Sequence, residues 1–168
     1  LLFCGPTSTV SIEIENSNVY KLISSNKKAY FDYLLFDKLE AGIALLGTEI
    51  KSIRRNGANL KDSYIKITDN LEAYLVNCHI SPYEFGNIYN KDPLRTRKLL
   101  LHKQEINRLY GMIKQKGISI VPTKMYFKNN KVKLELGIGK GKKLFDKRED
   151  IAKKDAEIKI QRALKNNY

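Results

Sequence analysis

The sequence predicts a mainly β protein with short helices, built as an OB-like closed antiparallel β-barrel with flanking helices and a flexible basic C-terminal tail. Three observations support this fold class. Several short apolar or alternating runs are separated by Gly, Pro, Asn and Asp, which is typical of strands joined by turns. Only two segments place apolar residues at helical spacing before a glycine. The end of the 168-residue chain is rich in charge and poor in apolar residues.

Residues 1–25 are predicted to be an extension that precedes the barrel. They are polar and irregular apart from an alternating patch at residues 10–14. The chain starts on the apolar residues 1–5 rather than on Met. We therefore expect either the remnant of a processed leader or a chain that was trimmed at this position.

The barrel is predicted to begin near Asn26 and to occupy residues 26–139. Its first half contains four expected strands, recognised by aromatic, apolar or alternating runs: residues 30–36, 41–45, 63–68 and 72–80. Residues 49–55 form an expected helix, which Gly57 ends because glycine tolerates the left-handed conformation. Residues 82–98 contain Pro, Gly, Asn and Asp and are expected to form a long loop.

The second half of the barrel contains an expected helix at residues 102–116. Its apolar positions fall on one face at helical spacing: Ile106, Leu109, Tyr110 and Ile113. Two further strands, residues 118–128 and 131–138, are expected around the turn Asn129-Asn130. Apolar and charged residues alternate in the last strand, which predicts one buried and one solvated face.

The predicted tail comprises residues 140–168, which hold ten Lys or Arg and five Asp or Glu. Acid-to-base pairs four residues apart, such as Asp155 with Lys159, favour a helix. The apolar stripe is thin and consists of Ile151, Ile158 and Ala163. We therefore expect this segment to be disordered in the free protein and helical on binding a partner.

The charge of the chain indicates the kind of partner that it binds. Lys and Arg number 31 against 18 Asp and Glu, which gives a formal net charge of +13. An excess of this size is typical of proteins that bind a polyanion, and nucleic acid is the commonest one. A basic protein whose charge has no binding role is the alternative. We expect no membrane partner, because no long basic amphipathic helix carries large aromatic anchors.

Residues that could carry chemistry are few. Cys4 and Cys78 lie far apart and form no paired motif, so we expect a reducing compartment and a buried, apolar role for Cys78. His79 and His102 are the only histidines, which is too few for a zinc site. No catalytic triad or carboxylate pair stands out. We therefore predict a protein without enzymatic activity, metal or cofactor.

Basic motifs are more informative. Residues 137–143 lack the Ser or Thr of a phosphate-binding P-loop, since Lys143 occupies that position, and we interpret them as a flexible basic hinge against a phosphate backbone. Further cations cluster on the first expected helix and before the leucines at residues 99–101: Lys51, Arg54, Arg55, Arg95, Arg97 and Lys98. Solvated charge is the alternative interpretation of both clusters.

Eight short motifs follow one another along residues 26–168. They are AYFDY (29–33), EAGI (40–43), GTEIKS (47–52), NLKDSY (59–64), PYE (82–84), DPLRTRKLLLHK (92–103), GKGKK (139–143) and DKR (146–148). In this order the series resembles the SsrA-binding protein (SmpB) family. The resemblance covers nearly everything except the extension.

The resemblance implies a protein that binds the tRNA-like domain of transfer-messenger RNA and delivers it to stalled ribosomes for trans-translation. It implies that the tail occupies the vacant messenger channel and the decoding centre of the small subunit, beside ribosomal RNA. We expect a monomer.

The resemblance and the basic clusters together define the expected sites. The RNA-binding residues are Asn26, Glu40, Lys51, Arg54, Asn59, Arg95, Arg97, Lys98, Leu100 and His102. The ribosome-binding residues of the tail are Lys140, Lys142, Lys143, Asp146, Lys147 and Arg148. Glu40 is unusual in a basic protein, and its carboxylate can accept hydrogen bonds from a base amino group or a 2′-hydroxyl. A structural salt bridge is its alternative role.

The chain departs from the family pattern at a few positions. Phe31 and Lys91 stand where the family usually has His, and Gly137 replaces a more usual Ala. The abundance of Asn, Lys, Ile and Tyr suggests an AT-rich genome, and with the extension this predicts a plastid- or apicoplast-type organelle, with the bacterial cytoplasm as the alternative. Two other functions stay open: a general OB-fold RNA-binding or ribosome-associated protein, and a nuclease or RNA-modifying enzyme.

Overall fold

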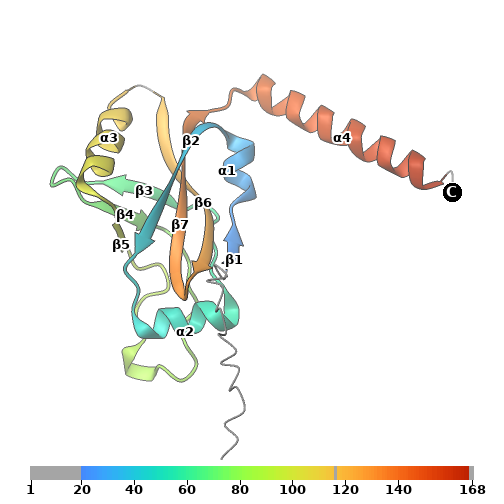
Figure 1. The fold of residues 1–168 in the computed structure, drawn as a ribbon. Helices are drawn as coiled ribbons and strands as arrows, with labels where there is room; N and C mark the ends of the chain where they lie inside the picture. The colour runs from blue at the N-terminus through green and yellow to red at the C-terminus, as the bar shows by residue number, and fades with distance from the viewer. Residues whose placement is uncertain (1–19, 116, 167–168) are drawn as a thin grey trace, which may run out of the picture.

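The computed structural model describes residues 20–115 and 117–166, which form one seven-stranded sheet flanked by helices (Figure 1). The strands are β1 (Tyr20–Ser25), β2 (Tyr33–Ile43), β3 (Tyr64–Ile67), β4 (Ala73–Val76), β5 (Arg97–Leu100), β6 (Ile118–Lys128) and β7 (Lys131–Gly141). The helices are α1 (Lys27–Asp32), α2 (Gly47–Asn56), η1 (Asn87–Tyr89), α3 (Lys103–Ile113) and α4 (Leu144–Asn166). Cys4, the apolar start and the patch at residues 10–14 lie outside the described residues.

The sheet is antiparallel throughout, with the strand order β1-β6-β7-β2-β5-β4-β3. The predicted closed barrel is wrong, because among the described strands no hydrogen-bonded ladder joins β3 to β1 or β6. Asn26 follows β1. Its side-chain amide donates to the carbonyl oxygens of Leu60 at 3.3 Å and Pro122 at 3.0 Å. This buried side chain therefore ties the start of α1 to β6 and to the segment that precedes β3.

The N-terminal part of the sheet differs from the sequence prediction. β1 belongs to residues predicted to be an extension, and it pairs with β6. Residues 27–32 are helical where a strand was expected from residue 30, because the Asn26 side chain accepts the Ala29 amide at 3.2 Å and begins α1. The two expected strands at 30–36 and 41–45 are one continuous strand, β2.

The hairpin of β6 and β7 is confirmed, and Asn129 and Asn130 form its turn at positive φ values of 51° and 63°. β5 was missed, because its short run lies at the end of the expected loop at residues 82–98. The core lies on the inner face of the curved sheet. Its fully buried residues include Leu75, Cys78, Leu99, Leu109, Met125, Leu134 and Leu136. The apolar role predicted for Cys78 is thus confirmed, and burial raises its thiol pKa to about 11.

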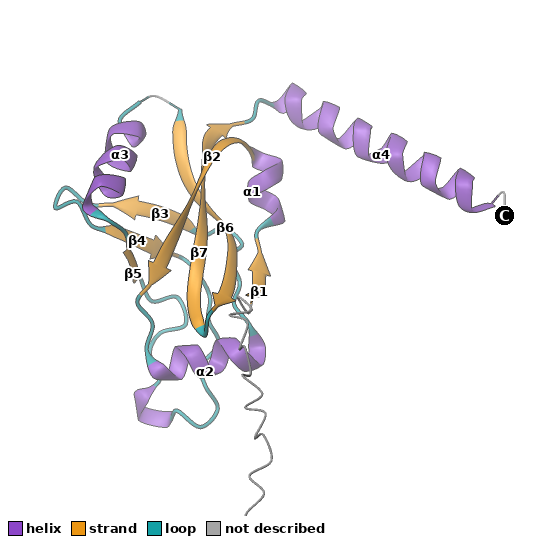
Figure 2. Cartoon of the chain, in the orientation of Figure 1, coloured by secondary structure: helices purple, strands orange, loops and turns teal. Residues whose placement is uncertain are grey.

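The C-terminal segment is a continuous helix in this structure, where a disordered free tail was expected. β7 runs to Gly141, and α4 then leaves the body as a single projecting helix (Figures 1 and 2). Its apolar residues from Ile151 to Leu164 are exposed, Ile158 among them. None of the helices in the described part of the chain is long and apolar enough to cross a lipid bilayer.

One buried ionic cluster joins α2 to the strands. The Glu49 carboxylate accepts hydrogen bonds from Arg97 at 2.5 Å, from Arg95 at 2.5 Å and from the Leu46 amide at 3.0 Å. Arg97 is completely buried and also donates to the carbonyl oxygens of Cys78 and Pro93. Burial raises the pKa of Glu49, but its three hydrogen bonds outweigh burial, and the pKa lies below its usual value.

We predict that Glu49→Ala destabilises the protein by about 3–5 kcal/mol, because it leaves the Arg97 guanidinium buried without its counter-charge. Urea unfolding followed by circular dichroism measures the change. Glu84→Ala is the matched control: Glu84 pairs with Arg55 at the surface, and its loss should cost no more than about 1 kcal/mol.

The same variant has a predictable pH dependence. A lowered folded-state pKa means that Glu49 stabilises fully above its unfolded pKa of about 4.3, and that this contribution is lost as the pH falls through the folded pKa. The stability difference between wild type and Glu49→Ala should therefore shrink on acidification. A difference that stays constant down to about pH 3 would contradict this assignment.

Candidate nucleic-acid interface

A groove of about 810 Å³ lies where β2, β5 and the start of α3 meet. Four of the predicted RNA-binding residues line it: Glu40, Lys98, Leu100 and His102. They come together because β2 and β5 are neighbours, with Gly42 opposite Leu100 in the register. The Leu100 side chain is 57% exposed, although its neighbour Leu99 is buried in the core. The groove thus presents an apolar side chain, a carboxylate and cations to one ligand.

Glu40 is held from one side by β6. Tyr126 donates its hydroxyl to the Glu40 carboxylate, and Lys128 lies 3.3 Å from the same carboxylate. The Tyr126 hydrogen bond and the Lys128 charge keep the Glu40 pKa below its usual value, although partial burial opposes them. The Glu40 side chain is still 40% exposed. The carboxylate is therefore ionised and fixed, with acceptor capacity left for a ligand.

The groove carries charge of both signs. Lys98 pairs with Glu72 at 3.1 Å, whereas Lys103 and Lys133 form no ion pair with the described residues. His102 precedes α3, and its backbone amide donates to Glu105 at 3.0 Å. Such a mixed surface can hold phosphates with the free lysines while the carboxylate selects a hydrogen-bond donor.

The basic cluster on α2 lies apart from the groove and faces aromatic rings. The Lys51 ammonium is 5.6 Å from the Tyr83 ring centroid, and the Arg54 guanidinium is 5.6 Å from that of Phe127. Both side chains are on exposed residues. They are therefore accessible from solvent, but at a different place from Glu40, and their contact with RNA stays a prediction.

Four other predicted RNA-binding residues are engaged within the protein. The prediction that Arg97 contacts RNA is wrong, because its side chain is completely buried. Asn26 is also buried, and its amide donates to the carbonyl oxygens of Leu60 and Pro122. Arg95 contacts Glu49, and the Asn59 side chain accepts the Lys61 amide at 2.9 Å. Sequence alone cannot separate such structural cations and amides from binding ones, because both are polar residues next to apolar runs.

The predicted tail residues meet the body at the base of α4. Lys147 lies 3.0 Å from Asp32 at the end of α1, and Lys142 pairs with Asp150. The Asp146 side chain accepts the Lys143 amide at 3.3 Å and caps the first turn. Lys140 and Arg148 are exposed. The ring of Phe31, one of the departures from the family pattern noted above, lies 5.8 Å from the Lys147 ammonium and 5.7 Å from that of Lys154.

Two functional candidates were missed by the sequence analysis. Tyr126 fixes Glu40, and Tyr20 of β1 packs on Tyr126 with ring centroids 4.8 Å apart. Their signal was weak, because Tyr126 lies in an expected strand with no polar motif beside it and Tyr20 lies in the expected extension. No group of His, Cys, Asp or Glu in the described residues could hold a metal ion.

Comparison with known proteins decides the family. The family model described as SmpB protein matches residues 23–166. The chain belongs to the SmpB family. The SsrA-binding protein of Acetivibrio thermocellus is 59% identical over 148 residues, which covers 88% of this chain and 96% of the relative. That of Pelobacter propionicus is 58% identical over 146 residues, with 87% and 95% covered.

A solved SmpB structure shares the fold. It is described as "tmRNA-SmpB: a journey to the center of the bacterial ribosome", and it superposes with a TM-score of 0.60 at 45% identity, covering 72% of this chain and 85% of that chain. The predicted family is confirmed. The two curated relatives are bacterial, so the predicted plastid- or apicoplast-type location gains no support from them.

Proposed function

We propose that this protein binds the tRNA-like domain of transfer-messenger RNA and delivers it to stalled bacterial ribosomes for trans-translation. Membership of the SmpB family is the observation that carries the proposal, since the SsrA-binding relatives match over most of their length. Its partners are transfer-messenger RNA and the ribosome, which places its work in the bacterial cytoplasm. The net charge of +13 agrees with an RNA partner.

Within this function, we assign the body and α4 different tasks. The groove of Glu40, Leu100 and His102 holds the tRNA-like RNA, with phosphates on the free lysines. The projecting α4 carries most of its charge on exposed side chains, so it can enter a channel lined by RNA phosphate. Asp32 and Phe31 support the first turns of α4 and give the helix a defined exit from the body.

A competition experiment tests the function. We expect the protein to bind a transcript of the tRNA-like domain much more tightly than an unstructured RNA of equal length, with affinity that falls as salt rises by a slope of roughly −0.7 to −0.9 per phosphate contact. Fluorescence anisotropy with each RNA as competitor measures both quantities. Equal affinity for the two RNAs would favour a general RNA-binding protein. An affinity that does not change with salt concentration would contradict the proposed phosphate contacts.

We predict that Glu40→Ala weakens binding of the tRNA-like RNA by about tenfold or more, because a hydrogen bond to a charged group is worth roughly 1.5–3 kcal/mol. The loss runs against simple electrostatics, since the variant is more positive. Tyr126→Phe should give a smaller loss in the same direction, because it keeps the carboxylate but removes the donor that fixes it.

The control for this prediction is Asp62→Ala. It changes the net charge equally at an exposed ion pair with Lys28 that does not line the groove. If Glu40→Ala and Asp62→Ala change the affinity alike, Glu40 has only a structural role. Circular dichroism of each variant verifies the fold.

We predict that a chain ending at Lys143 folds and binds the tRNA-like RNA almost normally but does not support peptide tagging on stalled ribosomes. α4 starts at Leu144, so the cut leaves the sheet and the groove intact. Replacing Asp146, Lys147 and Arg148 together by Ala should give the same separation. RNA affinity and tagging are measured in parallel for both variants.

The triplet variant needs its own control, because Asp146 and Lys147 also hold the base of α4. Asp32→Asn weakens only the ion pair with Lys147 and leaves the triplet unchanged. If Asp32→Asn abolishes tagging as fully as the triplet variant, the triplet acts by orienting α4 rather than by contacting the ribosome. A parallel loss of RNA affinity and tagging would reject the division of tasks.

A further inference from the structure

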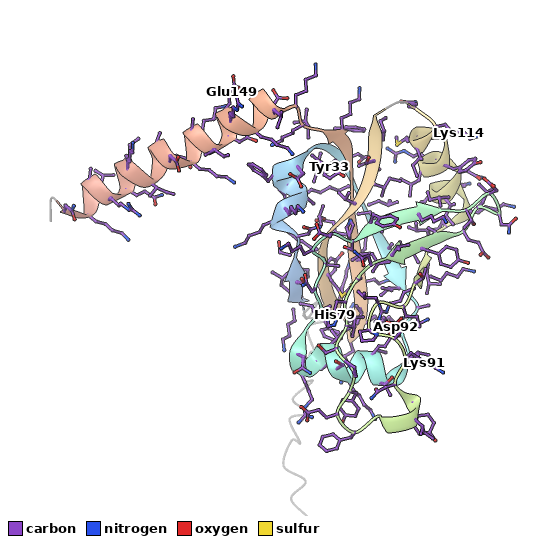
Figure 3. All side chains as sticks on the ribbon, turned by 180° about the vertical axis from the view of Figure 1, so that it is seen from behind. Tyr33, His79, Lys91, Asp92, Lys114 and Glu149 are labelled. Atoms are coloured by element: carbon purple, nitrogen blue, oxygen red, sulfur yellow. The ribbon has the colours of Figure 1, made fainter. Side chains whose placement is uncertain are left out.

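Large apolar side chains are exposed on one loop of the body, far from the start of α4. This aromatic loop comprises residues 83–90 and includes η1, which lies beside α2 at the opposite end of the molecule from the departure of α4 (Figure 1). Phe85 is 69% exposed, Ile88 84% and Tyr89 71%. Figure 3 places Lys91, just after the loop, at this same end, and Lys114 at the other. The proposed function does not use these side chains.

The aromatic loop is held by hydrogen bonds among its own residues, from the Asn90 side chain and from the backbone. The Asn90 side chain accepts the Tyr83 amide at 3.1 Å and donates to the Tyr83 carbonyl at 2.8 Å. The Gly86 amide donates to the Tyr83 carbonyl at 3.0 Å, and the Tyr89 amide to the Gly86 carbonyl at 2.9 Å. A Cβ at Gly86 would lie 2.4 Å from the Asn90 Oδ1 atom, so this closure requires glycine. The exposed rings are therefore presented on a closed, preorganised loop.

Cations lie between and beside the rings. The Arg55 guanidinium is 5.5 Å from the Phe85 ring centroid, and Lys51 and Lys91 line a hollow of about 460 Å³ together with Tyr89. Glu84 offsets part of this charge, since it lies 3.4 Å from Arg55. Aromatic faces alternating with cations are typical of surfaces that stack unpaired bases and neutralise the adjoining phosphates.

Hollows on the body surface lead from the groove that holds Glu40 toward the aromatic loop. A middle hollow of about 330 Å³ shares Gly42, Leu100 and Lys133 with that groove and extends to Leu45 and Ile50. The next residues along the chain, Leu46 and Lys51, line the hollow of the aromatic loop. We call this row of three hollows, which leads from the groove past the start of α2 to Tyr89, a track; Phe85 lies on the same loop as Tyr89 but lines none of the hollows.

We infer that the RNA in the groove continues along this track and stacks unpaired bases of the same tRNA-like RNA on Phe85 and Tyr89. The inference rests on the proposed function and extends its footprint to a second end of the body. The row of hollows that starts at the groove favours the tRNA-like RNA over a separate partner. The flanking Lys51, Arg55 and Lys91 favour RNA over an apolar protein surface.

The test compares the full chain with Phe85→Ala/Tyr89→Ala. We expect the variant to bind a transcript of the tRNA-like domain about tenfold or more weakly, because stacking of a base on an aromatic ring has a large effect on affinity. The slope of affinity against salt should stay unchanged, since no charge is removed. Chemical probing of the RNA should show unpaired nucleotides that wild type protects and the variant leaves reactive.

Two further variants separate stacking from folding. Gly86→Ala keeps every ring and charge but disrupts the closure by Asn90, and it should weaken the same RNA complex. Tyr64→Ala removes a half-exposed aromatic ring that lines none of the three hollows, and it should leave the affinity unchanged. Circular dichroism checks that each variant is folded.

An unstructured ribo-oligonucleotide distinguishes this inference from the proposed function. If wild type shows no preference for the tRNA-like RNA, the proposed function fails, while weaker oligonucleotide binding by the double variant still supports stacking on the loop. Equal binding of wild type and double variant to both RNAs overturns the inference. If the double variant binds both RNAs normally and loses affinity only for purified ribosomes, the inference is also overturned, and the loop is assigned to a ribosomal partner.

Discussion

The buried pair of Glu49 and Arg97 is the constraint on which the rest of the body depends. Arg97 belongs to β5, Glu49 to α2, and the guanidinium also holds the carbonyl oxygens of Cys78 and Pro93. One side chain thus ties together a helix, a strand and the segments that lead away from β4 and into β5. A buried guanidinium is tolerated only when its donors are satisfied, so these elements have a single mutual arrangement. β5 then places Lys98 and Leu100 in the groove. The aromatic loop lies in the chain between Cys78 and Pro93, the two residues whose carbonyl oxygens Arg97 holds.

The surface shows how a very basic protein can recognise one RNA rather than any RNA. Uniform positive charge would attract every phosphate backbone alike. Here the groove interrupts that charge with an ionised carboxylate, Glu40, and an exposed apolar side chain, Leu100. Tyr126 and Lys128 keep the carboxylate charged and oriented. A ligand must therefore supply a donor and an apolar surface at defined positions as well as phosphates.

The body and α4 meet over a small contact at the end of α1. The pair of Lys147 with Asp32 and the Phe31 ring between two lysines support only the first turns of the helix. Beyond this base α4 extends away from the body (Figure 2), and its residues 151–166 are all exposed. Its acid-to-base pairs support the helical form locally. A helix that is anchored at one end and solvent-exposed along the rest of its length can reach a partner well away from the groove.

The sequence by itself determined what depends on short-range pattern. The β6–β7 hairpin follows from alternation and from two asparagines that accept positive φ, and α3 follows from helical spacing. The ordered motifs, together with the charge, determined the family and the kind of partner. The helicity of α4 could also be anticipated, because its acid-to-base pairs lie four residues apart.

Tertiary structure decided what depends on distant neighbours. Asn26 begins α1 where a strand start was expected, and it ties that helix to β6 and to the segment before β3, since its partners Leu60 and Pro122 are far away in the chain. Arg97 and Arg95 belong to the same basic motif, but only the fold placed one wholly in the interior, because Glu49 lies opposite it. Tyr126 gained its role from Glu40 across the sheet. Burial and pairing set the roles of polar side chains. Neither can be read from the sequence, because the partners are adjacent only in three dimensions.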